Sequence, residues 1–360
     1  MLIRAVISAS ALGIYLLVRS CSSQHRRYSE LRKALGCALT DISQNRQWDV
    51  NAACILLSGG LDSAIVAEVG GKQLGLKTAL TVTCSDDATD LPYAAASAAA
   101  AGLEHIVIRI PLDELLRRYL PSVVRTIQSF DPMSLRNDIA ISCVLHEAAA
   151  RGFHCAATGD GADELLGGYG FTHGLEPAAW AAHRAHMARV MEFGSARLGK
   201  HLGIFVASPF THPAVKETAL RLRKDDCVQQ CNGVAMGKMV LRKLFPKVTS
   251  AMRRKDPIEV GCGTTALSKP GYFGSLIPDA QFASEKTYVA EHHGVEIRDK
   301  EHLYYYRVFR ETFPNGVVPG KPRHGSDPCP KCGYQLSDRF QTFCVTCGHY
   351  DPNMRMRHDS

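Results

Sequence analysis

Two short loops in this sequence contain residues suited to holding a polyphosphate. The first reads Ser58-Gly59-Gly60-Leu61-Asp62-Ser63, and the second, further along the chain, reads Gly159-Asp160-Gly161-Ala162-Asp163-Glu164. Each loop follows an apolar, strand-like run and leads into a helical pattern. If the two strands are parallel members of one sheet, both loops lie at the same edge, where α/β proteins bind their ligands.

The first loop has the features of an anion site. Gly59 and Gly60 let the backbone approach phosphate oxygens because no Cβ stands in the way. The hydroxyls of Ser58 and Ser63 and the start of the next helix also favour an anion. Asp62 suits such a site only with a hard cation such as Mg²⁺. The loop is not a Walker A motif, since no Gly-x4-Gly-Lys-Ser/Thr occurs, and an ordinary strand-turn-helix connection is the alternative.

The elements around these loops predict an α/β fold. Strands are expected at 52–57, 78–83, 105–110 and 155–158, and helices at 29–42, 62–74, 92–101, 112–128 and 134–151. This alternation predicts right-handed βαβ units and a parallel sheet. From 176 to 198 the pattern is helical, and the rest up to 313 is expected to be mostly helical. Residues 313–328, rich in Pro and Gly, are expected to form a linker.

Both loops resemble motifs of a known family. The Ser-Gly-Gly-x-Asp-Ser turn resembles the PP-loop of ATP pyrophosphatases, which cleave ATP between its α- and β-phosphates. The second loop, continued by Leu165-Leu166-Gly167-Gly168-Tyr169, is similar to the signature of the synthetase domain of asparagine synthetases and their β-lactam-forming relatives. The resemblance covers roughly residues 30–312 and implies a five-stranded, Rossmann-like (HUP/PP-loop) sheet with a helical C-terminal extension.

The resemblance also implies roles for individual residues. Asp163 would join Asp62 in binding magnesium-pyrophosphate, and Gly159 would lie against the adenylate. Ser208-Pro209-Phe210 is like the family's Val-Pro-Phe segment, and the similarity continues through Lys238-Met239-Val240-Leu241-Arg242 and Arg254-Lys255. Lys255 would stabilise the adenylated intermediate and the pyrophosphate, with Lys238 as a second candidate.

Three departures from the family pattern bear on substrate and nitrogen source. Asp160, a candidate catalytic carboxylate, stands where the family usually has Glu. Residues 257–263 replace the family's Phe-Ser-Asp-Gly-Val-Gly stretch, so the acceptor is expected to be a small carboxylate that need not be aspartate. No glutamine-hydrolysing domain is recognised, so the nitrogen donor is expected to be free ammonia, an amine, or ammonia from a separate amidotransferase.

A C-terminal zinc ribbon is predicted from cysteine spacing. Cys329-Pro-Lys-Cys332-Gly and Cys344-Val-Thr-Cys347-Gly form two knuckles, and four thiolates make a closed, structural Zn²⁺ site. Iron of the rubredoxin type is the alternative metal. The ribbon, residues 329–360, is expected to brace the C-terminal end or to bind RNA or a protein. Most of the other nine of the 13 cysteines are interpreted as small core residues.

The remaining features bear on location and partners. Residues 1–29 contain an apolar run from Ala5 to Val18 and no Asp or Glu, which fits a leader, an organelle transit peptide or a plain helix. A cytoplasmic location is preferred over organelle targeting or membrane anchoring through this segment, and no stable membrane partner is expected. Between Arg221 and Lys255 lie ten Lys and Arg against two Asp, a cluster that suits a polyphosphate, RNA or a solvated helix face.

The sequence therefore predicts an ATP- and Mg²⁺-dependent, AMP-forming amide ligase that carries Zn²⁺. Two alternatives remain. A PP-loop enzyme that adenylates a tRNA base would also suit a ribbon and a basic cluster, although the acidic loop favours the amide-forming branch. A non-catalytic zinc-binding scaffold is the third hypothesis, because Asp160 departs from the family pattern.

Overall fold

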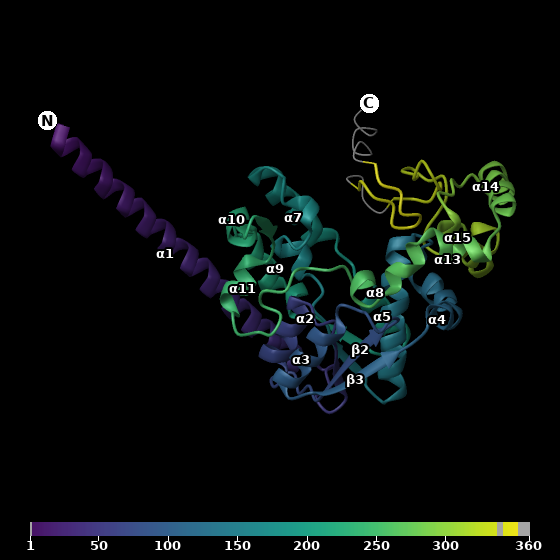
Figure 1. Cartoon of the computed structure of the whole chain (residues 1–360), viewed down its shortest axis with the longest axis horizontal. Helices are drawn as coiled ribbons and strands as arrows, with labels where there is room; N and C mark the ends of the chain where they lie inside the picture. Colours follow the sequence, from purple (N-terminus) through teal and green to yellow (C-terminus); the bar gives the residue numbers. More distant parts are fainter. Residues whose placement is uncertain (1, 337–340, 352–360) are drawn as a thin grey trace.

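The predicted parallel sheet is present in the computed structural model, which describes residues 2–336 and 341–351, with side chains from residue 23 on. Five parallel strands are arranged in the order β3-β2-β1-β4-β5 (Figure 1). Their bounds are β1 Ala53–Leu56, β2 Thr78–Thr83, β3 Glu104–Arg109, β4 Cys155–Ala157 and β5 Phe205–Ala207. The α/β fold class is therefore confirmed.

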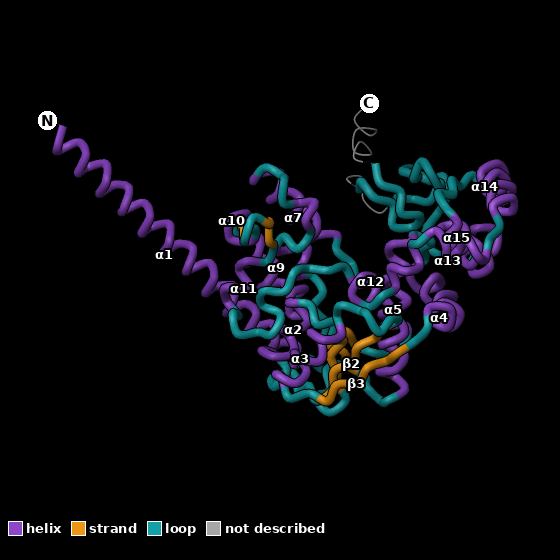
Figure 2. The backbone as a smooth tube through the Cα atoms, viewed as in Figure 1, coloured by secondary structure: helices purple, strands orange, loops and turns teal. Residues whose placement is uncertain are grey.

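Helices cover both faces of the sheet (Figure 2). Their bounds are α1 Leu2–Ser43, α2 Leu61–Ile65, α3 Leu91–Ala101, α4 Leu112–Ile127, α5 Pro132–Ala150, α6 Ala162–Leu166, α7 Pro177–Val190, α8 Gly194–His201, α9 Pro213–Leu220, α10 Lys224–Cys227, α11 Met239–Leu244, α12 Ile258–Gly261, α13 Pro270–Leu276, α14 Asp279–His293 and α15 Lys300–Thr312. The helix expected over 62–74 ends earlier, since α2 continues only as a π-helical turn over Val66–Gly70.

Two hydrophobic cores flank the sheet, because alternate strand residues point to opposite faces. Ile55 and Ala157 face a core shared with α1, α3, α6, α9 and α11. Cys54 and Ala156 face the other core, which contains α4, α5 and α15 and extends into the cysteine-rich C-terminal segment. The sheet thus holds two helical layers at defined positions relative to the loops at its carboxyl edge.

Residues 176 to 313 are mostly helical, as expected, but they also contain three short strands that the sequence did not predict. Phe205–Ala207 is the edge strand β5, which pairs with β4, and β6 (Gln229–Cys231) and β7 (Val234–Met236) form an antiparallel hairpin. Three-residue strands are too short to show a periodic pattern. Their main-chain partners lie elsewhere in the chain, so only the assembled sheet reveals β5.

The N-terminal helix α1 packs against the body of the protein through its second half. The first half of α1 extends away from it (Figure 1), whereas residues from Leu31 to Leu39 belong to a hydrophobic core. The apolar run Ala5–Val18 lies where side chains are not described. Within the described part of the chain, no helix combines the length and apolar character needed to cross a bilayer.

Candidate active site

The glycine turn, residues 58–63, connects β1 to α2 at the carboxyl edge of the sheet. Gly59 has a φ of +72°, and a Cβ there would lie 2.4 Å from the backbone nitrogen of Ala94 in α3, so only glycine fits. The hydroxyls of Ser58 and Ser63 lie 3.1 Å apart and the Gly60 N–H donates to Ser58 Oγ, so the turn curls around its own serines.

The acidic loop, residues 159–164, connects β4 to α6 and lies directly against the glycine turn. A Cβ on Gly159 would fall 2.7 Å from Cβ of Asp62 and 2.8 Å from the backbone nitrogen of Ser63. The order of the strands explains this contact, because β4 is hydrogen-bonded to β1. The two loops singled out in the sequence therefore meet at the topological switch point, where open α/β sheets bind ligands.

Two carboxylates, one from each loop, converge on a single buried ammonium group. Lys238 Nζ forms an ion pair with Asp62 Oδ2 and lies 2.6 Å from Asp163 Oδ1. Lys255 Nζ lies 3.0 Å from the other oxygen of Asp163. The Lys238 side chain is only 2% exposed, whereas that of Lys255 is 34% exposed, so Lys255 forms the solvent-facing side of the cluster.

The pKa values of the two carboxylates diverge within this cluster. Burial raises the pKa of Asp62, and nearby Asp163 adds to that effect against the attraction of Lys238. Burial acts in the same direction on Asp163, but Lys238 and Lys255 together outweigh it and lower its pKa to about 2. For Lys238, the two carboxylates overcome burial and raise the pKa. Asp163 and Lys238 are thus charged at neutral pH.

Glycines and one arginine bring Lys238 to this position. Lys238 has a φ of +56° at the start of α11, and a Cβ on Gly168 would lie 1.6 Å from Asp163 Oδ1 and 2.7 Å from Lys238 Cε. Arg242, one helical turn after Lys238, donates to the carbonyl oxygens of Gly237, Ala251 and Arg253. This buried guanidinium group therefore ties the backbone beside Lys238 to the segment that carries Lys255.

The segment that carries Lys255, residues 249–264, is called the lysine loop here. Arg253 Nη2 donates to Asp90 Oδ1 at 2.6 Å, and its guanidinium carbon lies 4.3 Å from the ring centroid of Tyr93. Ser250 Oγ donates to the carbonyl oxygen of Gly59. The lysine loop is therefore held against the glycine turn and the start of α3, which places Lys255 over Asp163.

The same two carboxylates are suited to a hard divalent cation. Asp62 Oδ1 is buried and has no hydrogen-bond partner among the described residues, and it lies beside the ion-paired Oδ2. Carboxylate oxygens are the ligands that Mg²⁺ prefers, and binding one requires an oxygen not already occupied. Asp62 and Asp163 therefore fit the predicted magnesium site, although their role as ligands stays a prediction.

Comparison with known proteins agrees with this geometry. Residues 38–202, which include both loops, match the family model described as asparagine synthase. This part of the chain is thus similar to that family. Asparagine synthetase B [glutamine-hydrolyzing] of Escherichia coli (strain K12) is 24% identical over 295 residues, which cover 74% of this chain and 52% of that protein. The family resemblance of the two loops is confirmed.

Other relatives match shorter parts of the chain or more weakly. The putative asparagine synthetase [glutamine-hydrolyzing] 1 of Methanocaldococcus jannaschii is 29% identical over 41% of this chain and 26% of its own length. Overall, the chain spans about half the length of most of the curated relatives it matches. Among solved structures, the NH3-dependent NAD synthetase from Campylobacter jejuni covers 45% of this chain and 73% of its own, at 20% identity and a TM-score of 0.28.

Asp160 of the acidic loop occupies a different environment from the other predicted site residues. Its Oδ2 accepts hydrogen bonds from Ser195 Oγ at 2.5 Å and Thr158 Oγ1 at 2.8 Å, and its carbonyl oxygen accepts one from Ser208. Burial raises its pKa, against the effect of the Ser195 and Thr158 hydrogen bonds. Asp160 is therefore hydrogen-bonded to the start of α8, while the charge of Lys255 acts to lower its pKa, and its catalytic role stays a prediction.

The basic cluster between Arg221 and Lys255 divides into two groups. Lys238, Arg242 and Arg253 are buried, and each is bound within the protein. Exposed members include Arg221, Arg223, Lys243, Lys247 and Arg254. The buried group is neither a solvated helix face nor an RNA-binding surface, because its charges serve the fold and the candidate site.

Two positioning residues were missed by the sequence reasoning. Arg242 appeared only as the last residue of the Lys238 motif, although its spacing of four from Lys238 places both on one side of α11. The buried pair of Arg253 with Asp90 joins positions 163 residues apart. No local pattern signals such a pair in a single sequence.

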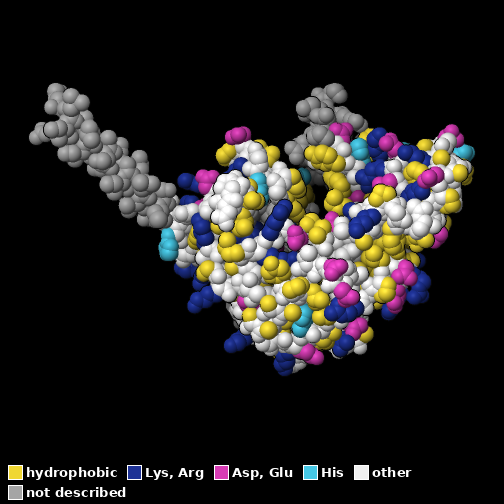
Figure 3. All heavy atoms as spheres, viewed as in Figure 1, with side chains coloured by type: hydrophobic (Ala, Val, Ile, Leu, Met, Phe, Trp, Pro, Cys, Tyr) yellow, Lys and Arg dark blue, Asp and Glu magenta, His cyan; other side chains and the backbone are white. Residues whose placement is uncertain are grey.

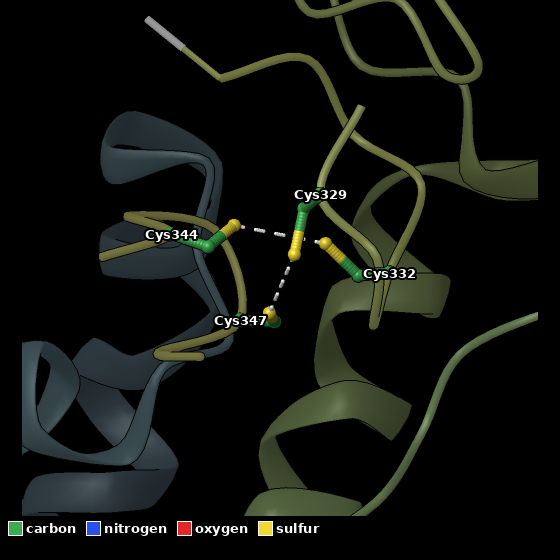
Figure 4. A group of neighbouring side chains, drawn as sticks. All are labelled: Cys329, Cys332, Cys344 and Cys347. Carbon is green, nitrogen blue, oxygen red and sulfur yellow. Dashed lines mark hydrogen bonds between the residues drawn. The ribbon is translucent and has the colours of Figure 1, made fainter. Parts of the chain in front are cut away.

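The four cysteines of the predicted ribbon come together as a metal site would require. Their Sγ atoms all lie within 4.8 Å of one another, and the Cys329–Cys347 and Cys332–Cys344 distances are 3.8 and 3.7 Å (Figure 4). A tetrahedron with Zn–S bonds of about 2.3 Å has sulfur–sulfur edges of about 3.8 Å. All four side chains are buried. The arrangement is consistent with a structural zinc ribbon.

Proposed function

We propose that this protein is an ATP-dependent, AMP-forming amide ligase that activates a carboxylate as its adenylate and then joins it to ammonia or an amine. The observation that carries the proposal is the convergence of Asp62 and Asp163 on Lys238, with Lys255 beside them. Positive charge held at the meeting point of the glycine turn and the acidic loop is what a leaving pyrophosphate requires. The match to the asparagine synthase family model supports it.

The reaction consists of two displacements. A carboxylate oxygen of the acceptor attacks the α-phosphorus of ATP, and the bond to the bridging oxygen of the β-phosphate breaks, which releases pyrophosphate. The amine nitrogen then attacks the acyl carbon, AMP leaves, and the nitrogen loses a proton. Each displacement moves negative charge onto the group that leaves. Cations fixed in advance around that group therefore lower both barriers.

Individual residues have distinct parts in this proposal. The glycine turn, with Ser58 and Ser63, would cradle the pyrophosphate, and Gly159 allows the adenylate to approach closely. Asp62 and Asp163 would hold Mg²⁺, which neutralises phosphate charge when bound. Lys255, whose side chain is partly exposed beside Asp163, would stabilise the α-phosphate and the developing carbonyl charge. Lys238 keeps the two carboxylates together.

Product analysis tests the proposal directly. The full chain is incubated with ATP, Mg²⁺, aspartate and ammonium, and nucleotides and pyrophosphate are quantified. We expect AMP and pyrophosphate in equal amounts, and Lys255→Met should lower their formation by about 10²–10³-fold. Lys247→Met, which removes an exposed lysine nearby in sequence, is the matched control and should retain activity. ADP and phosphate as products would refute the proposal.

The acceptor and the nitrogen donor need separate measurements. A panel of amino acids in place of aspartate identifies the acceptor, because residues 257–263 differ from the family pattern. Glutamine in place of ammonium tests whether the protein alone releases ammonia; no product with glutamine would support a separate amidotransferase partner. Pyrophosphate release that needs bulk tRNA instead of an amino acid would replace the amide-ligase proposal with the base-adenylating alternative.

A further inference from the structure

We infer that the metal-loaded ribbon is a positioning element of the candidate active site. The ribbon fixes the position of the lysine loop through the first turns of α5. In this inference the ribbon acts within the chain and not as a platform for RNA. Only the expected effect of the ribbon on turnover rests on the proposed function. The structural coupling itself can be measured in the absence of any reaction.

The second knuckle of the ribbon is hydrogen-bonded to the segment between α4 and α5. Ser129 Oγ donates to the carbonyl oxygens of Val345 and Thr346 at 2.8 and 3.2 Å, and the Phe130 N–H donates to Thr346 at 2.8 Å. From the other side, Arg298 Nη1 donates to the carbonyl oxygen of Gly348 at 2.7 Å. These carbonyls belong to the turn around Cys344 and Cys347, so their directions depend on the folded knuckle.

The ribbon also shares a hydrophobic core with the helices. Its four cysteines and Tyr334 belong to the same buried cluster as α4, α5 and α15. Tyr334 packs edge-on against Phe309 of α15, with ring centroids 5.6 Å apart. Figure 4 shows the knuckles lying between ribbons of these helices. Small metal modules fold only with their metal, so loss of the metal would open this shared core.

The same inter-helix segment leads directly into α5, which contacts the lysine loop. Asp131 caps α5 and accepts from the N–H groups of Met133 and Ser134. One turn later, the carbonyl oxygen of Arg136 accepts from Thr264 Oγ1 at 3.0 Å, and Asn137 Oδ1 accepts from the Glu259 N–H at 3.1 Å.

From Glu259 the lysine loop leads back toward the site. The N–H of Asp90 donates to the carbonyl oxygen of Gly261, and Asp90 holds Arg253, two residues before Lys255. A continuous series of main-chain segments and hydrogen bonds therefore joins the knuckle to the lysine that contacts Asp163. Any shift of the first turn of α5 would move one end of the lysine loop.

Hydrogen exchange on the zinc-loaded full chain tests this inference. Ser129→Ala removes the hydroxyl that donates to the two knuckle carbonyls and that accepts from the Asp131 N–H, and it leaves all four cysteines in place. We expect the zinc content to stay at one ion per chain. The amide hydrogen of Glu259 should exchange roughly 5- to 30-fold faster, because losing one or two such hydrogen bonds changes an opening equilibrium by about this factor. The β6–β7 hairpin should not change. Val345→Ala, which keeps the carbonyl and alters an exposed side chain, is the control.

Further variants separate the possible outcomes. Asn137→Ala cuts the same path at its other end, so its effect on Glu259 and that of Ser129→Ala should be non-additive. Faster exchange confined to the ribbon, or equal in the hairpin, would overturn the inference. So would salt-sensitive RNA binding that is lost when the zinc is removed, because it would place the ribbon at an RNA interface. Hydrogen exchange is measured without any turnover. A failure of the AMP assay alone would therefore refute the proposed function and leave this inference standing.

Discussion

Replacing Lys238 by methionine gives the sharpest test of the charge cluster. The ammonium group is 2% exposed and is paired with both Asp62 and Asp163, whose side chains are 13% and 14% exposed. Removing one partner from a buried ion pair costs about 3–5 kcal/mol, because the remaining charges lose their counter-charge. For a chain of this size, such a loss corresponds to a decrease in Tm of about 4–7 °C.

Magnesium should then distinguish this variant from the parent protein. With Lys238 gone, the two carboxylates face one another with only Lys255 nearby, and a divalent cation can replace the lost charge. A ligand that binds the native state stabilises it in proportion to the logarithm of its concentration. We therefore expect Mg²⁺ to raise the Tm of Lys238→Met more than that of the parent protein.

Thermal unfolding followed by circular dichroism, with and without Mg²⁺, measures both effects. Lys243→Met, on the same helix but at an exposed position, is the matched control and should alter stability by no more than about 0.5 kcal/mol. Pyrophosphate release by Lys238→Met should fall by about 10²–10³-fold. If Lys238→Met melts like the control, or if Mg²⁺ stabilises it no more than the parent, the assignment of a shared cation site is wrong.

Three further substitutions probe the surroundings of the cluster. Gly159→Ala would place a Cβ 2.7 Å from Asp62 Cβ and push the two loops apart. A displacement of about 1 Å can lower turnover by about 10²-fold. Calorimetry should also show weaker ATP binding by this variant. Burial raises the pKa of Asp138 to about 7, so the folded state keeps a proton that the unfolded state has already lost. The free energy of unfolding should therefore fall by up to about 4 kcal/mol between pH 4 and pH 7 and stay constant above pH 7. Urea unfolding of Asp138→Asn at several pH values should show no such decline. A pH profile of the variant that matches the parent protein would contradict the argument. Arg242→Lys keeps the charge, but a lysine cannot reach three carbonyl groups at once. We expect pyrophosphate release to drop at least about tenfold with an unchanged circular dichroism spectrum. Full activity would show that these three hydrogen bonds are not needed to position Lys238.

The sequence alone predicted the features that depend on neighbouring residues. Apolar runs ending in glycine turns located β1 and β4, since a buried strand and a turn each have a local signature. Cysteine spacing predicted the grouping of the four thiols for the same reason: two residues between cysteines form a knuckle whatever the rest of the fold does. The order of the two loops along a βαβ series also implied that they share one edge.

Tertiary structure decided which distant residues complete the site. Lys238 meets Asp62 across 176 positions, and Arg253 meets Asp90 across 163. The sequence offered both lysines only through a family resemblance, and nothing in it indicated that Ser195 and Thr158 hold the carboxylate of Asp160. Contacts of this kind depend on how helices and loops pack over the sheet. Packing is a property of shape and buried charge in the whole chain, and a single sequence records no pairwise signal of it.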